Sequence, residues 1–595
     1  MSLRPSKAKP EKLSAARLAN IPLLKDASPR ALKAAEKEAS HFSLPGGWRL
    51  FETGEPADAI YFVLSGSLGA FRRAPDGRTE FVGHIRSGEP VGEMALVAGE
   101  THQNAVYALR DTEVIRISRA GFMRIVKSDP SIMERLTRVM LVRLRQSKRR
   151  QLRASDPRVF ALLSTSPTID LSLRANTLAG ALRRIGLDVV IIGEEAVDKD
   201  ASYFDAMEAN HDIVLLTAPI GDTPWFKLTL RQADRIWVLG RADAHPSSPL
   251  IPDDDSPARR FRLVDVLLLH NGCDRKGADP EDWASAAEAS RIFHWDGLDD
   301  EDCNRLARVI SGRSVGLVLS GGGARAYAHI GVVRALREAG CPIDFAGGAS
   351  MGAVIAACLS CGWNDAEIDD RIRRAFVSSN PLGDYNLPVV SLVSGKRVDA
   401  RLEEHFGDRK IEELDIPFFA VSANLTHGAY RVHDRGVLRH ALRASISLPG
   451  ILPPTIDDGE ILVDGAVLNN FPVDVMRDLH RGRIIGCDVA RASEGLNVND
   501  FIDPPNFFEW TLENGFAAAP PIASLLMRAA TVSVNPTAGR ELTDMLILPE
   551  LVDIELRDWK SYDDAVEAGY IATKHAISNT TGPLANLMRK PLPAL

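Results

Sequence analysis

Cysteine is scarce in this 595-residue sequence, which argues against a secreted protein held together by disulfides. The six cysteines are scattered and none precedes Cys273, whereas a disulfide framework needs an even set at close spacings. The sequence also lacks a run of about 18 uninterrupted apolar residues, the length of a membrane-spanning helix. The first residues are positively charged but lead into no apolar segment, so no secretory signal is expected. These absences favour a cytoplasmic protein that reaches any membrane from the aqueous side.

A strong charge of either sign is missing as well. The sequence has 71 basic and 79 acidic side chains and a net charge of -8, which gives no global electrostatic case for nucleic-acid binding. No recognition-helix module typical of a transcription factor is evident. The phosphate-binding patterns GxxxxGK[ST] and GxGxxG do not follow the first strand predicted in the middle of the chain, so no nucleotide is assigned there.

Length and hydrophobic periodicity predict a multidomain fold of roughly three or four domains. Short β segments between turns, followed by a helical stretch, predict a β-rich module with a closing helix over residues 15–150. Alternating buried strands and helices predict a middle α/β parallel-sheet domain over residues 155–300 that bridges its neighbours. Another buried strand, Val315–Leu319, opens a third α/β domain over residues 310–590.

A glycine-rich loop follows this third strand. Ser320-Gly321-Gly322-Gly323 stands between the strand and a predicted helix. Three glycines in this place let backbone N–H groups turn toward one point at a helix N-terminus, where unsatisfied donors and the helix dipole favour negative charge. The loop therefore predicts a site for an oxyanion or a phosphate.

The next strand leads into Gly348-Ala-Ser350-Met-Gly352, a GxSxG sequence followed by an apolar helix. In this strand-turn-helix context the pattern predicts a nucleophilic serine on a tight, strained turn, with Gly348 and Gly352 needed because a Cβ would collide with the adjoining elements. A serine hydroxyl needs a base to remove its proton. The short strand that ends at Asp464, before Gly465 and Ala466, would present a carboxylate there; the alternative is that Asp464 only caps a turn.

Together the glycine loop with Arg325, the GxSxG sequence and Asp464-Gly465-Ala466 resemble the patatin-like phospholipase family. Further stretches resemble its neuropathy target esterase branch, so that the likeness covers nearly the whole chain: Thr223-Pro-Trp225, Arg231-Gln-Ala-Asp234, Ser394-Gly-Lys, Arg443-Ala-Ser-Ile-Ser-Leu-Pro and Asn469-Asn-Phe-Pro. The resemblance implies a C-terminal patatin-like hydrolase domain that cleaves fatty-acyl esters of lysophospholipids or phospholipids through a Ser–Asp dyad, without metal or cofactor.

The resemblance also implies a role for each motif. Ser350 would attack the acyl carbonyl, and Asp464 would take its proton. The oxyanion hole would be formed by loop residues Gly321, Gly322, Gly323 and Arg325, with Arg325 orienting the loop or meeting the lipid phosphate.

In the N-terminal module, Val91-Gly92-Glu93-Met94 resembles the phosphate-binding cassette of cyclic-nucleotide-binding β-rolls. The resemblance implies a β-roll in which Glu93 accepts a ribose hydroxyl and an arginine some nine residues later grips the phosphate. His102 occupies that position, and a histidine is mostly neutral near pH 7 and lacks the planar fork of donors. We therefore expect a β-roll that does not hold a cyclic nucleotide, and that binds another ligand or controls the hydrolase domain.

Two other functions stay open on the sequence alone. The order Ser350, Asp464, His480 fits an α/β-hydrolase triad, and His329 is a further candidate base. Alternatively, the chain is a ligand-sensing signalling protein whose hydrolase half serves as a lipid-binding domain.

Three remaining features have ordinary and functional interpretations. Cys358-Leu-Ser-Cys361 has redox-motif spacing but lies in an apolar helix, which favours buried packing. The basic run Arg143–Arg153 is either a solvated helix face or a contact with an anionic membrane. The apolar stretch Phe516–Met527 is either core or an element through which lipid enters.

Overall fold

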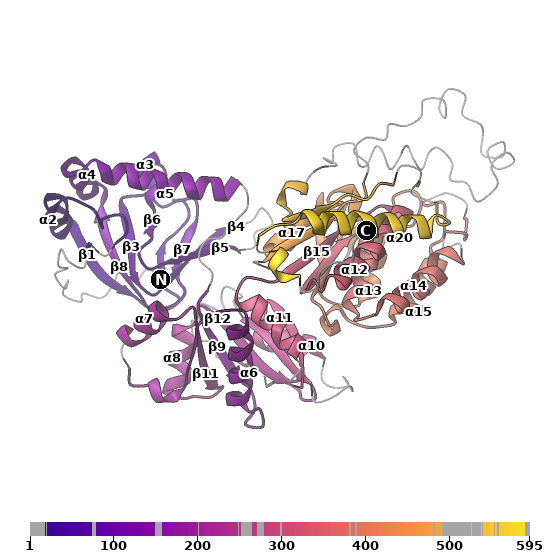
Figure 1. Ribbon diagram of the computed structural model, residues 1–595. Helices are drawn as coiled ribbons and strands as arrows, with labels where there is room; N and C mark the ends of the chain where they lie inside the picture. The colour runs from indigo at the N-terminus through magenta and orange to yellow at the C-terminus, as the bar shows by residue number, and fades with distance from the viewer. Residues whose placement is uncertain are drawn as a thin grey trace. The chain divides into compact units, whose positions relative to one another are not determined.

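The computed structural model describes residues 18–588 with the exception of residues 20, 74–78, 149–156, 200, 248, 252–263, 271–278, 298–299, 380–381, 387–389, 481, 491–524, 526–536, 538, 552–553, 556–557 and 583. The chain divides into two compact units, Met1–Ser311 and Gly312–Leu595 (Figure 1). The predicted boundary between the first and middle domains, at residues 150–155, lies outside the described residues.

The first unit begins with the predicted β-roll, which is confirmed. Two four-stranded antiparallel sheets pack face to face, in the orders β1-β8-β3-β6 and β2-β7-β4-β5. The closing helices bury Ile125, Ile132 and Leu136 against the first sheet. The bounds are β1 Ala39–Leu44, β2 Arg49–Phe51, β3 Ala59–Ser65, β4 Ser67–Arg73, β5 Thr79–Arg86, β6 Pro90–Val91, β7 Ala105–Ala108 and β8 Thr112–Ser118, with helices α2 Pro29–Glu38, α3 Glu93–Ala98, α4 Arg119–Ser128 and α5 Ser131–Lys148.

A six-stranded parallel sheet follows in the same unit, in the order β10-β11-β9-β12-β13-β14. Its central strands carry almost uninterrupted apolar residues because helices cover both faces of such a sheet. The bounds are β9 Val159–Ser164, β10 Val189–Ile192, β11 Ile213–Pro219, β12 Arg235–Arg241, β13 Val264–His270 and β14 Arg291–Asp296, with helices α6 Leu171–Arg184, α7 Ala201–Asn210, α8 Pro224–Gln232, α10 Pro280–Ala287 and α11 Asp300–Ile310.

Arg110 ties the β-roll to this parallel sheet. Its side chain is 3% exposed and forms ion pairs with Glu208 of α7 and, at 3.5 Å, with Asp234 immediately before β12. Apolar side chains of the roll, including Phe71 and Tyr107, share one core with the sheet. The two folds of the first unit are therefore joined by a continuous core and a buried cation.

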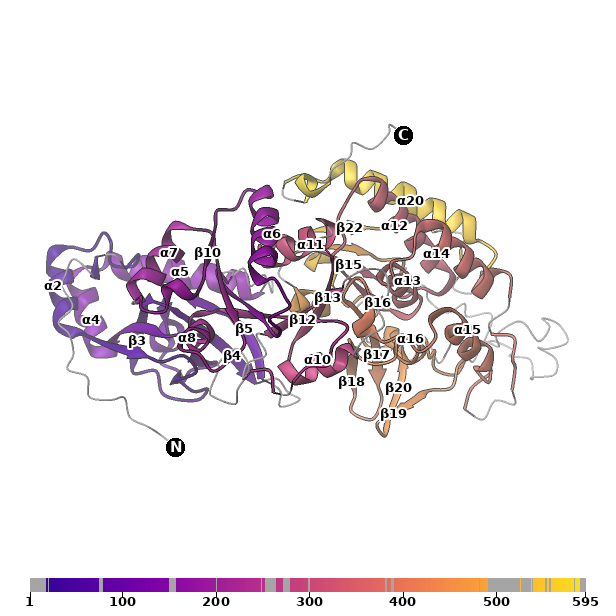
Figure 2. The same cartoon turned by 90° about the horizontal axis from the view of Figure 1, so that it is seen from below.

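The second unit is built on one mixed sheet in the order β19-β20-β17-β16-β15-β21-β22, with β18 also paired to β17. Strands β15, β16, β17, β21 and β22 are parallel, whereas β18 and β20 run against β17. The bounds are β15 Val315–Leu319, β16 Phe345–Ala349, β17 Phe418–Asn424, β18 Ala429–His433, β19 Thr455–Asp457, β20 Glu460–Asp464, β21 Arg483–Cys487 and β22 Met545–Ile547. Figure 2 shows β19 and β20 as a hairpin at one edge of this unit.

Strands β16 and β20 meet end to end along the same side of β17. Ala349, the last residue of β16, pairs with Val421, and Asp464, the last residue of β20, pairs with the next residue, Ser422. Strand β18 occupies the opposite side of β17 over these positions. Because β16 is parallel and β20 antiparallel to β17, the carboxyl ends of both strands face each other at this junction.

Helices cover the sheet, and two of them cross at very short range. A Cβ on Gly331 of α12 would lie 1.9 Å from the backbone oxygen of Val566, and one on Gly569 of α20 would lie 1.9 Å from that of Ala328. Glycine is therefore required at both positions. The bounds are α12 Ala328–Glu338, α13 Ser350–Ser360, α14 Asp365–Ile372, α15 Lys396–Phe406, α16 Leu438–Ser445, α17 Val473–Leu479 and α20 Tyr562–Asn579, with the short helices η2 Gly323–Tyr327, η3 Arg373–Val377 and η5 Gly465–Val467.

Among the described residues, no helix combines the length and the apolar character that a membrane crossing requires.

Replacing Arg110 by Met tests the buried ion pairs of the first unit. The change leaves Glu208 and Asp234 without their buried cation, and breaking such a pair typically costs roughly 3 to 5 kcal/mol. We expect the unfolding transition of the first unit to move to a clearly lower temperature in differential scanning calorimetry. The matched control is Arg116→Met, which removes an exposed pair with Asp58 and is expected to cost about 1 kcal/mol or less. Equal shifts in the two variants would contradict the assignment.

Candidate active site

Ser350 lies at the turn between β16 and α13, as the GxSxG context predicts. Its φ angle is 52°, a left-handed conformation that is strained for a residue with a Cβ. The flanking glycines make the turn possible: a Cβ on Gly348 would lie 2.2 Å from the backbone oxygen of Leu319, and one on Gly352 would lie 2.4 Å from the same atom. The elbow thus holds the serine at the carboxyl end of a central parallel strand.

The structure brings Asp464 directly against this serine. Ser350 Oγ donates a hydrogen bond of 2.6 Å to Asp464 Oδ2, and the two residues are 5% and 0% exposed. The other carboxylate oxygen, Oδ1, accepts the N–H of Ala466 at 2.8 Å. The base and turn-capping interpretations of Asp464 therefore both fit, because its two oxygens have different partners.

The last residue of α16 and the residues just after it hold both members of the pair. The Ser445 hydroxyl accepts the backbone N–H of Ser350 at 2.9 Å and donates to the backbone oxygen of Val421 at 2.7 Å. Two residues later, the backbone oxygen of Ser447 accepts the N–H of Asp464 at 2.9 Å. The sequence contained these serines within a recognisable motif, but gave no sign that one turn anchors both the serine and the carboxylate.

Burial gives Asp464 an unusual affinity for protons. Removal from water raises the pKa of its carboxyl from 3.8 to about 7, although the hydrogen bonds from Ser350 and Ala466 favour the charged form. A general base works best when its pKa lies near the operating pH. Near neutral pH this carboxyl can therefore both take a proton from Ser350 and return it.

The glycine loop approaches the serine closely, but not all its N–H groups are available. A Cβ on Gly321 would lie 3.0 Å from Ser350 Cβ. Gly321 donates its own N–H to the backbone oxygen of Asn470 at 3.2 Å, and Asn470 Nδ2 donates back to the Gly321 oxygen at 3.2 Å. The prediction that Gly321 supplies an oxyanion donor is therefore wrong. The N–H groups of Gly322 and Gly323 have no acceptor among the described residues.

Three roles were predicted for Arg325: orienting the glycine loop, meeting the lipid phosphate and forming part of the oxyanion hole. Its side chain is 4% exposed, and Nε donates to the backbone oxygen of Ile554 at 2.7 Å. This contact fastens the glycine loop to the C-terminal part of the unit. The placement fits a residue that orients the loop, and its roles toward a lipid phosphate and in the oxyanion hole stay predictions.

Neither histidine lies where a base for Ser350 is needed. His329 on α12 is fully buried, its Nε2 bonds to the backbone oxygen of Ser320 at 2.9 Å, and burial lowers its pKa to about 4. His480 stacks on Phe345, the first residue of β16, and its Nδ1 lies 3.0 Å from Ser314 Oγ. His480 is thus at the amino ends of the strands, opposite to Ser350, so the alternative Ser350–Asp464–His480 triad is wrong.

In the β-roll, the structure brings Gly92, Glu93 and His102 together as the cassette predicts. The His102 ring stacks on Phe51 with centroids 3.7 Å apart, and a Cβ on Gly92 would lie 3.0 Å from His102 Cε1. Burial lowers the pKa of His102, although Glu55 and Asp58 act in the opposite direction. A neutral ring therefore packs where the resemblance places an arginine and a phosphate.

Other predicted features are placed only in part. Cys358 and Cys361 are free thiols. Side chains of the basic run Arg143–Arg153, and all but one residue of the stretch Phe516–Met527, lie outside the described residues. Within the described part of the chain, no group of three or more His, Cys, Asp or Glu side chains is arranged to hold a metal ion.

Two parts of the chain match the models of known protein families. Residues 317–477 match the model of the patatin-like phospholipases, and residues 41–129 match that of the cyclic nucleotide-binding domain. The first match contains the glycine loop, Ser350 and Asp464, and the second contains the cassette with His102.

The chain is also similar over most of its length to individual proteins. An NTE family protein of Mycobacterium tuberculosis is 32% identical over 578 residues, which cover 94% of this chain and 96% of the relative. Patatin-like phospholipase domain-containing protein 6 of the mouse is 28% identical over 89% of this chain and 44% of its own. A solved cyclic nucleotide-binding-like protein from Brucella abortus is 32% identical over 19% of this chain and 97% of its own, with a TM-score of 0.18.

Asp464→Asn tests the burial of the carboxyl through protein stability. Because the pKa is higher in the folded state, the contribution of Asp464 to stability is full below pH 3.8 and is lost as the pH rises toward 7. Asparagine keeps the shape of the side chain and removes the buried charge. We expect Asp464→Asn to stabilise the second unit by on the order of 2 kcal/mol at alkaline pH, and by less at acidic pH.

Thermal unfolding as a function of pH measures this difference. The control is Asp564→Asn, which changes an exposed carboxylate of the same unit and should not show the same rise in stability with pH. A variant at position 464 that is less stable than the native protein at alkaline pH would contradict the buried-charge account.

Proposed function

We propose that this chain, which belongs to the NTE family, is a serine lysophospholipase or phospholipase. Its patatin-like domain would use a Ser350–Asp464 dyad. The observation that carries the proposal is the 2.6 Å hydrogen bond from Ser350 Oγ to Asp464 Oδ2 at the junction of β16 and β20. Both groups are buried, so water cannot compete with the proton transfer between them.

In the first step, Ser350 Oγ attacks the carbonyl carbon of a fatty-acyl ester while its proton passes to Asp464 Oδ2. The tetrahedral intermediate collapses when the bond to the leaving alcohol breaks, and Asp464 returns the proton to that alcohol. A water molecule then attacks the acyl-enzyme, gives a proton to Asp464 and releases the fatty acid. As the bond between the acyl carbon and Ser350 Oγ breaks, Asp464 returns this proton to Oγ, so the cycle needs neither a metal nor a cofactor.

The negative oxygen of each tetrahedral intermediate requires donors that are already in place. We assign this role to the N–H groups of Gly322 and Gly323, since they have no acceptor among the described residues and begin the helical turn next to Ser350. Their position at a helical N-terminus favours negative charge. Losing one donor of this kind typically costs about 3 kcal/mol of transition-state stabilisation.

We propose that the first unit regulates the hydrolase without a cyclic nucleotide. The His102 ring, neutral and stacked on Phe51, fills the place of the phosphate-binding arginine. The ion pairs of Arg110 with Glu208 and Asp234 make the β-roll and the parallel sheet one mechanical unit. In this proposal the parallel sheet bridges the β-roll to the hydrolase, and the enzyme meets its lipid as a peripheral membrane protein.

Fatty-acid release from lysophosphatidylcholine tests the dyad. We expect the native protein to release fatty acid, Ser350→Ala to be silent because it lacks the nucleophile, and Asp464→Asn to lose at least about a hundredfold in kcat because an amide cannot accept the proton. Circular dichroism checks that each variant is folded.

The matched control is His480→Ala, which removes a buried residue from the other end of the same sheet. It is expected to retain the dyad and measurable turnover. Loss of activity in a folded His480→Ala protein, together with activity in Asp464→Asn, would overturn the dyad.

The pH profile provides a second test. Since the pKa of Asp464 is about 7, the carboxylate needed to accept the Ser350 proton is lost as the pH falls below that value. We expect log kcat/KM to fall by about one per pH unit on the acidic side and to level off above neutrality. The measurement is made at constant ionic strength with folding checked at each pH. A profile that is flat down to pH values near 5 would show that Asp464 is not the base.

A further inference from the structure

Three consecutive peptide groups join Ser320 to Gly323 and form the glycine loop. Each of their carbonyl oxygens accepts a hydrogen bond: that of Ser320 from His329 Nε2 at 2.9 Å, that of Gly321 from Asn470 Nδ2 at 3.2 Å and that of Gly322 from the N–H of Arg325 at 3.1 Å. The N–H of Gly321 donates to the backbone oxygen of Asn470, whereas those of Gly322 and Gly323 have no acceptor among the described residues. Within the described part of the chain, the last two peptide groups are therefore held by their carbonyl ends alone.

Asn470 holds the middle peptide group, which contains the carbonyl of Gly321 and the N–H of Gly322. A trans peptide group is planar, so its N–H points away from its C=O. The hydrogen bond that draws the Gly321 oxygen toward Asn470 Nδ2 thus directs the Gly322 N–H to the opposite side. In this way the side chain of Asn470 sets the direction of a donor to which it is not bonded.

This peptide group needs an anchor because glycine stands on both sides of it. Glycine adopts many backbone conformations at little steric cost, so the sequence itself offers little resistance when the peptide group between Gly321 and Gly322 rotates. The next residue, Gly323, has a φ of 54°, in the left-handed region that favours glycine. The loop sequence permits the observed conformation, but it does not select it.

The side-chain amide of Asn470 has a defined orientation. With its two ends exchanged, Oδ1 would face the Gly321 oxygen, and two acceptors would repel each other. In the observed orientation Oδ1 is buried and has no hydrogen-bond partner among the described residues, which disfavours the folded state. It lies 2.5 Å from the point that a Cβ on Gly321 would occupy. Stability alone therefore does not account for this asparagine, whereas a role for Nδ2 does.

Asn470 also belongs to the segment that carries the base. It follows Asp464 by six residues, and the turn between them contains a 2.8 Å hydrogen bond from the N–H of Asn469 to the backbone oxygen of Gly465. The neighbouring side chain has a different contact, because Asn469 Nδ2 donates to Asp474 Oδ1 at 2.9 Å. Of these two adjacent asparagine side chains, it is that of Asn470 that bonds to the glycine loop.

We propose that Asn470 is a positioning residue for the oxyanion hole. Through the Gly321 carbonyl, its side chain directs the Gly322 N–H toward the oxygen that becomes negative when Ser350 attacks the ester. The proposal rests on the proposed function and adds to it the residue that prepares one of the two donors. Asn470 acts through the peptide group and needs no contact with the substrate.

Asn470→Ala tests the proposal with two substrates, palmitoyl lysophosphatidylcholine and its thionoester, in which sulfur replaces the carbonyl oxygen. The change removes Nδ2 but keeps the backbone contact of residue 470 with Gly321. Loss of one oxyanion donor typically lowers kcat by about 10²–10³, so a misdirected donor is expected to cost about tenfold or more in kcat, with little change in KM. Because sulfur accepts hydrogen bonds weakly, the thionoester gains less from the donor. We therefore expect the ratio of the oxygen-ester rate to the thionoester rate to fall by a similar factor.

The matched control is Asn469→Ala, which removes the same side chain from the adjacent position and should leave kcat and the substrate ratio unchanged. In Asn470→Ala the acidic limb of the pH profile is expected to stay at its native position, because the variant retains Asp464 and its hydrogen bond from Ser350. A folded Asn470→Ala protein that loses activity toward both substrates equally, or that loses none, would contradict the positioning role.

Crystal structures of the native protein and of Asn470→Asp test the same role without turnover. The carboxylate repels the Gly321 oxygen and attracts an N–H, so we expect the peptide group between Gly321 and Gly322 to turn over in the variant. If the native protein hydrolyses neither ester, the proposed function fails, and a turned peptide group still supports Asn470 as the anchor of the loop. An active enzyme with an unturned peptide group in Asn470→Asp and an unchanged substrate ratio in Asn470→Ala overturns the positioning role alone.

Discussion

The buried hydrogen bond between Ser350 and Asp464 is the interaction around which the second unit is organised. A carboxylate without a nearby cation is expensive to bury, and the raised pKa of Asp464 is the sign of that cost. The strand order of the sheet keeps the carboxyl buried in spite of this cost. Strands β16 and β20 approach from opposite directions on one side of β17 and end at adjacent positions, so the two side chains meet where their backbones have no freedom to separate.

The residues around Ser350 and Asp464 form hydrogen bonds that hold the backbone in place, and those described here add no charge. Ser445 and Ser447 hold the two residues through N–H groups, and Asn470 holds Gly321 through both of its polar groups. The geometry of the dyad therefore depends on backbone contacts with residues that are distant from it in the sequence.

The placement of the two side chains was predictable from local sequence, since Ser350 directly follows a strand and Asp464 ends one, each at a tight turn. The steric need for Gly348 and Gly352 followed from the same context. What could not be predicted rests on contacts between distant residues. The backbone oxygen of Asn470 accepts the N–H of Gly321, and the backbone oxygen of Ile554 accepts a hydrogen bond from the side chain of Arg325.

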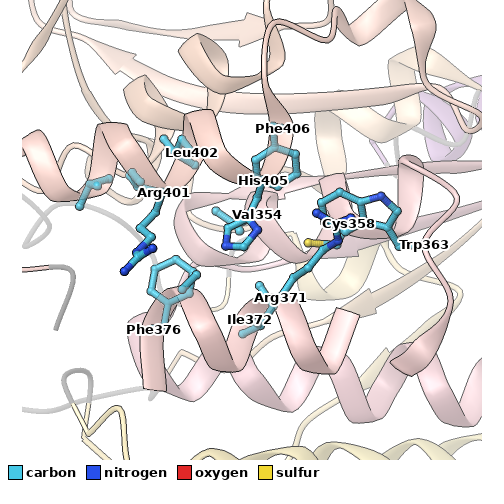
Figure 3. A pocket seen from close by; sticks show the side chains of 13 residues that line it. Val354, Cys358, Trp363, Arg371, Ile372, Phe376, Arg401, Leu402, His405 and Phe406 are labelled. Carbon is cyan, nitrogen blue, oxygen red and sulfur yellow. The ribbon is translucent and has the colours of Figure 1, made fainter. Parts of the chain in front are cut away.

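The limits of prediction were similar elsewhere in the chain. The spacing of the cassette placed His102 correctly, but its stacking on Phe51 depends on an earlier strand that no motif marks. The order Ser350, Asp464, His480 agreed with a triad until the sheet placed His480 at the opposite strand ends. A small apolar pocket behind α13 (Figure 3) could not be predicted either, because its wall comes from several separate helices.

The central claim is that Ser350 is a nucleophile activated by Asp464 alone. Reaction with a long-chain alkyl fluorophosphonate, followed by peptide mass mapping, tests it most directly, because the reagent forms a stable bond with an activated serine. The account predicts one adduct, on the peptide that contains Ser350, formed about a hundredfold more slowly in Asp464→Asn. An adduct on another residue, or equal rates in the two proteins, would contradict it.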